Sequence, residues 1–182
     1  MSTEIDAPRL CGNLELRYLR GMYDFAPLTD ASKPELYEEL ARAAQALVEG
    51  EPDAVANMAN LAALIWQFVP DLNWSGFYRM VEDELVLGPF IGKPACIRIP
   101  LSSGVCGAAA RTGETQLVPD VHAFPGHIAC DADSRSELVV PVVVDGKVIA
   151  VIDLDSPLPD RFDDEDAKGF ARLAEITAKA IG

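Results

Sequence analysis

Two β-rich runs meet at a two-residue turn late in the chain, and this pair constrains the fold more than any other feature. The runs are LVVPVVV (138–144) and KVIAVIDLD (147–155), joined by Asp145-Gly146. An Asp-Gly pair between two apolar runs is a strong indicator of a tight β-hairpin. The chain is therefore expected to contain antiparallel strands in this region.

Further strands and helices are predicted around this hairpin. Strands are expected over 74–81, 85–90 and 95–100, and a short helix over 104–111, followed by a polar loop over 119–136. Ser32 and Glu35 fit a capping box at the start of a helix that runs to Gly50. A second helix is expected from Asp53 to Pro70, and a last one from the acidic cluster DDED (163–166) to the C-terminus.

These elements indicate an α+β fold, with helices flanking an antiparallel sheet and long loops on one side. Residues 1–31 show no sustained periodicity and are predicted to form an N-terminal arm, which leaves 32–182 as a single domain. A chain of 182 residues is long enough to bury a substantial core.

Charge and hydropathy exclude several classes of function. The formal net charge is −14, which disfavours binding to nucleic acids or acidic membranes. No apolar run approaches the roughly 20 residues that span a bilayer, and the first residues lack the features of a signal peptide. We therefore expect a cytoplasmic protein, whose cysteines rest as thiols unless a disulfide forms transiently during catalysis.

Three cysteines and three carboxylates fall within sixty residues and are the candidates for chemistry. They are Cys96, Cys106, Cys130, Glu137, Asp153 and Asp155. Cys130 lies in a polar loop, where a reactive thiol is plausible, and a second thiol could resolve its sulfenic acid to a disulfide. A small buried hydrophobe is the plainer interpretation of each cysteine. A Cys₃His zinc site that includes His127 is a third, weakened by the absence of a CxxC pair.

Asp153 and Asp155 lie two residues apart on a strand, so both carboxylates point to the same face. Such a pair needs a cation between the two groups or a proton on one of them. A substrate ammonium would satisfy this need, and so would a protonated carboxyl that donates to a polar oxygen. Alternatively, the strand simply ends in solvent here. Trp74 and Tyr78, on one face of an earlier strand, are either core residues or an aromatic wall for an apolar methyl group.

At this point the sequence resembles the GAF-type free methionine-(R)-sulfoxide reductases over roughly residues 35–181. The matching stretches are NWSGFY (73–78), LVLGPFIGKPACIRIP (85–100), GVCG (104–107), VHAFPGHIACDADSRSE (121–137) and VIDLDS (151–156). Ser102-Ser103 is less typical of the family, which bears on one loop contact. The resemblance implies a GAF-like fold.

The resemblance also implies a role for each candidate residue. Cys130 would be the nucleophile, and one or both of Cys96 and Cys106 would resolve. Glu137 and Asp155 would act in acid catalysis and, with Asp153, Trp74 and Tyr78, in substrate binding. The enzyme would be a cytoplasmic homodimer without a cofactor or metal. It would reduce free L-methionine (R)-S-oxide through a redox-active disulfide that thioredoxin reduces, as part of oxidative stress repair. A non-catalytic GAF sensor module that binds a small ligand is the alternative.

Overall fold

A computed structural model describes Phe25, Pro27 and residues 31–126 and 131–182. Most of the predicted N-terminal arm, including Cys11, lies outside these residues, and so do His127 and Cys130. Within the described part of the chain, no helix has both the length and the apolar character that a membrane span requires.

The sheet has six antiparallel strands in the order β3-β2-β1-β6-β5-β4, so the strands of the predicted hairpin, β5 and β6, lie side by side within it. The strands are β1 (Trp74–Val81), β2 (Glu84–Gly92), β3 (Arg98–Pro100), β4 (Gln116–Val118), β5 (Ser136–Val144) and β6 (Lys147–Ser156). The helices are α2 (Lys33–Val48), α3 (Ala54–Phe68), α4 (Gly104–Thr112) and α5 (Asp164–Ile181), with a 3₁₀ turn η1 (Val121–Ala123). The α+β architecture expected from the sequence is confirmed.

The predicted hairpin is confirmed at β5 and β6. Asp145 and Gly146 both have a positive φ, 49° and 76°, which is the backbone of a type I′ turn. Val144 pairs with Lys147 beside the turn, and the ladder continues to Glu137 opposite Asp155 and Ser136 opposite Ser156. The turn thereby sets which residues of the two strands face each other at the far end of the hairpin.

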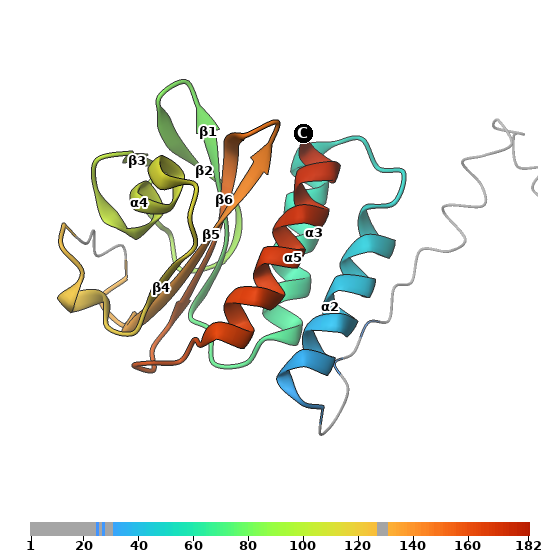
Figure 1. The fold of residues 1–182 in the computed structure, drawn as a ribbon, viewed down its shortest axis with the longest axis horizontal. Helices are drawn as coiled ribbons and strands as arrows, with labels where there is room; N and C mark the ends of the chain where they lie inside the picture. The colour runs from blue at the N-terminus through green and yellow to red at the C-terminus, as the bar shows by residue number, and fades with distance from the viewer. Residues whose placement is uncertain (1–24, 26, 28–30, 127–130) are drawn as a thin grey trace, which may run out of the picture.

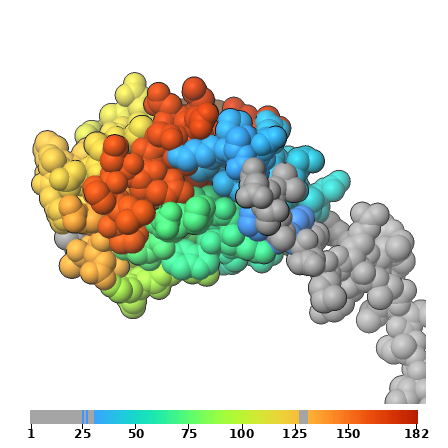
Figure 2. Space-filling model, turned by 90° about the horizontal axis from the view of Figure 1, so that it is seen from below, coloured from blue at the N-terminus to red at the C-terminus, as the bar shows by residue number. Residues whose placement is uncertain are grey.

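Helices α3 and α5 form a layer on one face of the sheet, and α2 lies on the outer side of this layer (Figure 1). Helix α2 packs against α5 and α3, and Figure 2 shows α2 in blue beside α5 in red at the surface. The capping box predicted at Ser32 is present, because Glu35 Oε2 accepts hydrogen bonds from the backbone N (2.9 Å) and the hydroxyl (2.7 Å) of Ser32. The larger of the two cores lies between this layer and the sheet.

The opposite face of the sheet is covered by α4 and the loops around it (Figure 1). A second, smaller core lies there, with Trp74, Tyr78, Leu85 and Val139 from the sheet against α4. Two differences from the predicted elements are also on this side. Strand β3 begins at Arg98 and not at residue 95, and β4 and η1 were not predicted. Both strands are three residues long at the edges of the sheet, where pairing with a neighbour decides the conformation.

Candidate active site

The three predicted carboxylates meet at one end of the sheet, on the face that α4 covers. Glu137 of β5 lies directly opposite Asp155 of β6, and Asp155 lies opposite Trp74 of β1 on its other side. Asp153 is two residues before Asp155, so its side chain projects from the same face. Glu137 and Asp153 are each only 6% exposed. The alternative that the strand ends in solvent is therefore wrong for Asp153.

Burial makes these carboxyl groups hold their protons more tightly than usual. Loss of hydration raises the pKa of Glu137 and of Asp155 well above the ordinary range, and the nearby charge of Asp153 adds to both shifts. The same loss of hydration raises the pKa of Asp153 to about 6. The three groups titrate as one cluster, which can carry a proton near neutral pH. It can therefore donate to a substrate oxygen and still hold negative charge for a cation.

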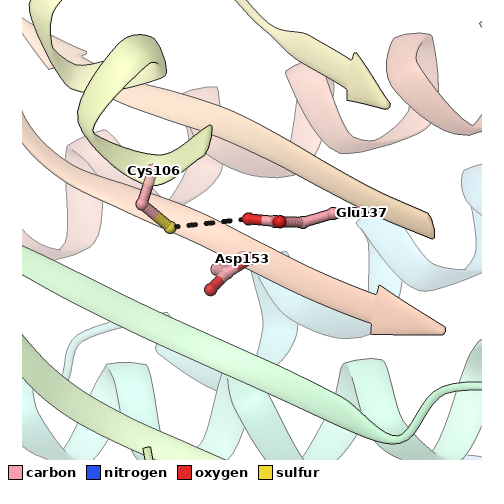
Figure 3. Close-up of side chains that lie close together, drawn as sticks. All are labelled: Cys106, Glu137 and Asp153. Atoms are coloured by element: carbon pink, nitrogen blue, oxygen red, sulfur yellow. Dashed lines mark hydrogen bonds between the residues drawn. The ribbon is translucent and has the colours of Figure 1, made fainter. Parts of the chain in front are cut away.

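Cys106 lies against this cluster from the first turn of α4. Its Sγ lies 4.0 Å from Oε1 of Glu137, and Asp153 lies beside the pair (Figure 3). Burial and the adjacent Asp153 and Glu137 carboxylates raise the pKa of the thiol well above its ordinary value. A thiol in this setting is a poor nucleophile, because the thiolate is the reactive form.

An aromatic wall closes another side of the site. The Trp74 ring stacks on Tyr78, with centroids 5.8 Å apart, and on Phe90, with centroids 5.2 Å apart. The indole lies close over Gly92, where a Cβ atom would come within 2.7 Å of the Trp74 ring. The Tyr78 hydroxyl donates to the carbonyl of Cys96 at 3.0 Å. Trp74 Nε1 is buried and has no hydrogen-bond partner among the described residues, so it can donate to a ligand.

Four polar residues of the site were not assigned from the sequence. Asn73 precedes β1, and its Nδ2 donates to Asp131 Oδ2 (3.2 Å) and to Ser134 Oγ (3.0 Å). The polar side chain of Ser134 also lowers the pKa of Asp155, which partly offsets the effect of burial. Lys93 Nζ lies 3.1 Å from Asp131 Oδ1. These residues lie in loops and at strand ends, where no hydrophobic periodicity marks a side chain as inward-facing.

Together these groups line one pocket. Its lining comprises Trp74, Tyr78, Lys93, Pro94, Ala95, Ile99, Gly104, Val105, Cys106, Asp131, Ser134, Glu137, Asp153 and Asp155. Six of the eight residues predicted for the site are thus brought together. Cys96 directly follows Ala95 of the lining, and Cys130 lies outside the described residues.

The cysteines differ in their chemical state. Cys96 is disulfide-bonded, whereas Cys106 is a buried free thiol. The Cys₃His zinc alternative needs Cys96 as a thiolate, which a disulfide cannot supply. Donor atoms of Cys106, Glu137 and Asp153 do lie within 4.8 Å of one another. These three residues could bind a cation only after losing protons, and their raised pKa values make that loss unfavourable.

We expect Asp153→Asn to flatten the pH dependence of stability. The pKa of Asp153 rises from 3.8 to about 6 on folding, so the folded state binds the extra proton. Its contribution to stability is therefore present below about pH 4 and is lost as the pH rises toward 6. At about pH 8 the variant should be more stable than the wild type by up to about 3 kcal/mol. Urea unfolding between about pH 4 and 8 measures this.

Asp145→Asn in the exposed hairpin turn is the matched control for this prediction and should leave the pH profile unchanged. The depressed pKa of Asp163, about 2, acts with the opposite sign, because its stabilising effect is lost on acidification. That loss falls below about pH 4, outside the window tested. A parallel profile for wild type and Asp153→Asn would contradict the prediction.

The comparison with known proteins agrees with this geometry. The family model of the GAF domain matches residues 55–182. A free methionine-R-sulfoxide reductase from Escherichia coli is 47% identical over 150 residues, 82% of this chain and 91% of that protein. The free methionine-R-sulfoxide reductase of Neisseria meningitidis, solved in complex with its substrate, is 45% identical, with a TM-score of 0.81 over 86% of this chain and 95% of that one.

A structure from Burkholderia vietnamiensis, described provisionally as a GAF sensor, is 57% identical, with a TM-score of 0.80 over 83% of this chain and 96% of that one. The fold and the pocket define a GAF domain with a site of thiols, carboxylates and aromatic rings. The chain belongs to the GAF-domain family of free methionine-R-sulfoxide reductases.

Proposed function

We propose that this protein reduces free methionine-(R)-sulfoxide to methionine in the pocket, with cysteine thiols as the source of electrons. The observation that carries the proposal is the buried carboxylate cluster, which faces an aromatic wall next to the disulfide-bonded Cys96. A sulfoxide oxygen leaves only when it is protonated or strongly hydrogen-bonded. A carboxyl with a raised pKa can supply that proton near neutral pH.

The proposed chemistry has three balanced steps. The Cys130 thiolate attacks the sulfoxide sulfur, the oxygen passes to the cysteine with a proton from the cluster, and methionine leaves. A second thiol then attacks the sulfenic acid of Cys130, which gives a disulfide and one water molecule. An external dithiol reduces this disulfide by exchange. The net change is oxidation of one dithiol for each sulfoxide reduced.

Substrate selection follows from charge and shape. A free amino acid carries an α-ammonium group, which the remaining charge of Asp153 and Asp155 would hold. A methionine sulfoxide within a peptide has no such group, so the free form is favoured. The substrate methyl would lie against Trp74 and Tyr78. The preference for the R configuration at sulfur is expected from the family alone.

We assign the resolving role to Cys96 rather than to Cys106. Cys96 is already in a disulfide, and the buried Cys106 has a raised thiol pKa. Cys96→Ser should therefore slow thioredoxin-driven turnover at least about tenfold, because sulfenic acid is no longer resolved, while the first methionine is still released. Cys106→Ser is the matched control. It should change the ratio of thioredoxin-driven turnover to single-turnover methionine release much less. Thioredoxin-coupled turnover and single-turnover methionine release measure both.

A reversed result, with Cys106→Ser losing turnover and Cys96→Ser retaining it, would assign resolution to Cys106.

We further propose a cytoplasmic homodimer that uses thioredoxin. The domain is expected to span 32–182 after an arm over 1–31, although the family model begins at residue 55. Gel filtration and activity of a chain truncated before residue 32 test these assignments.

The alternative is a GAF sensor that binds a small ligand without chemistry, as the description of the Burkholderia relative suggests. A sensor needs no reactive thiol chemistry, and the buried acids would repel the phosphate of a cyclic nucleotide. The deciding experiment incubates the reduced protein with free methionine-(R)-sulfoxide, its S isomer and a peptide-bound sulfoxide. Methionine formed from the free R isomer supports the reductase. Binding without any methionine formed supports the sensor.

A further inference from the structure

Lys93 joins two segments that each adjoin a candidate redox cysteine. It lies between β2 and β3, three residues before Cys96. Its Nζ lies 3.1 Å from Asp131 Oδ1 and 2.5 Å from Asp133 Oδ2. Asp131 directly follows Cys130 in the chain. The ammonium group therefore connects the Cys96 segment to the turn after Cys130, across 38 residues of sequence.

The turn that contains Asp131 and Asp133 is held in place by contacts that do not involve Lys93. Asp131 is only 8% exposed at its side chain, and its Oδ2 accepts from Asn73 Nδ2 at 3.2 Å. Its Oδ1 accepts from the backbone N of Asp133 at 3.0 Å. A few residues on, Arg135 N donates to the carbonyl of Ser156 at the end of β6, at 2.7 Å. Lys93 therefore reaches a fixed acceptor from a separate segment.

Both partners are charged at neutral pH. The hydrogen bonds that Lys93 donates to Asp133 and Asp131 raise the pKa of Lys93, and the hydrogen bond that the backbone N–H of Asp133 donates to Asp131 lowers the pKa of Asp131. Lys93 remains 60% exposed at its side chain, so solvent and salt screen the interaction. The link is therefore weak by itself and gains importance only where it brings two reacting groups together.

We propose that Lys93 is a positioning residue for the thiol pair, because its ion pairs with Asp131 and Asp133 hold the Cys96 segment against the turn that follows Cys130 when no disulfide joins them. This inference rests on the proposed function, in which Cys96 resolves the sulfenic acid of Cys130. A link that keeps two thiols near each other raises their effective concentration, which favours the disulfide. It would speed resolution relative to loss of the sulfenic acid to further oxidation.

The test measures the effective concentration of the thiol pair and needs no sulfoxide. The protein dithiol is equilibrated with oxidised glutathione, giving the protein disulfide and two reduced glutathione molecules, and both protein forms are counted after alkylation. Lys93→Met should lower this equilibrium constant about three- to tenfold, which makes the reduction potential less negative by about 15 to 30 mV. Lys93→Arg keeps the charge and should retain most of the constant.

Salt and a matched variant separate this role from a merely structural one. Raising the ionic strength from about 0.1 M to 1 M shortens the Debye length from about 10 Å to 3 Å. The wild-type constant should fall toward that of Lys93→Met, while the variant changes little. Lys147→Met removes the same charge from the exposed hairpin at the opposite end of β6, and it should match the wild type at both salt concentrations.

The outcomes distinguish this inference from the proposed function. Peptide mapping of the oxidised protein identifies the partner of Cys96. A Cys96–Cys130 disulfide with the same constant in wild type and Lys93→Met, at both salt concentrations, would overturn the role of Lys93 alone. A different partner for Cys96 would overturn the proposed thiol chemistry, and the role of Lys93 with it. Circular dichroism checks that each variant is folded. We expect this, because the substituted lysines are exposed.

Discussion

Replacing Cys130 with serine should abolish the reduction of free methionine-(R)-sulfoxide, with dithiothreitol as well as with thioredoxin. A serine hydroxyl is far less nucleophilic than a thiolate and cannot accept the oxygen as a sulfenic acid. Loss of a nucleophile typically costs about 10⁴-fold or more in turnover. Methionine formation by the reduced variant, followed by chromatography at saturating substrate, measures the effect. Substrate binding should persist, because the carboxylates and the aromatic wall are intact.

Cys11→Ser is the matched control, because Cys11 has no counterpart in the motifs that the family shares, and it should retain full activity. The dithiothreitol assay is important, since it bypasses the resolving cysteine and isolates the first step. Turnover by Cys130→Ser within tenfold of the wild type would remove Cys130 as the nucleophile. Attention would then turn to Cys96, which directly follows Ala95 of the pocket lining and is disulfide-bonded.

Glu137→Gln should produce the second large effect, in which activity and stability change in opposite directions. Glu137 is buried beside Asp153 and Asp155, and this environment raises the pKa of its carboxyl well above the ordinary range. An amide cannot donate a carboxyl proton to the sulfoxide oxygen, so turnover should fall about 10²- to 10⁴-fold, the usual contribution of a general acid. Steady-state kinetics with dithiothreitol, compared at several pH values, measures this.

The same substitution should stabilise the protein without ligand at alkaline pH. Because the pKa of Glu137 is higher in the folded state, its ionisation in the unfolded chain destabilises the native state as the pH rises above about 4. Glu137→Gln removes the ionisable carboxyl and therefore this loss of stability at high pH. Glu114→Gln, at an exposed loop position, is the matched control and should change neither property. A variant that loses stability and activity together would indicate that Glu137 is a structural residue only.

Much of the fold could be predicted because local chemistry and global structure agree. The Asp145-Gly146 turn, the Ser32 cap and the apolar periodicities are all short-range features, and each was found where it was expected. The edge strands β3 and β4 were misplaced or missed because three residues carry too little pattern. Their conformation depends on hydrogen bonds to β2 and β5, which belong to other parts of the chain.

The site divides in the same way. The two-residue spacing predicted that Asp153 and Asp155 share a face, and the structure has them so. Nothing in the sequence indicated that Lys93 would reach Asp131, or that Asn73 would hold the same carboxylate, because these contacts join loops through space. Whether Cys96 and Cys106 are disulfide-bonded or free thiols likewise depends on which groups the fold places next to each sulfur atom.

The sequence by itself determined the hairpin, the helical caps, the shared face of the two aspartates and the membership of the family, because each depends on residues near one another in the chain or on whole motifs. The tertiary structure alone decided which groups meet. The β5–β6–β1 register places Glu137, Asp155 and Trp74 in one row, and α4 buries Cys106 against Glu137. Burial then raises the pKa values of the acids, and hydration is a property of the assembled fold.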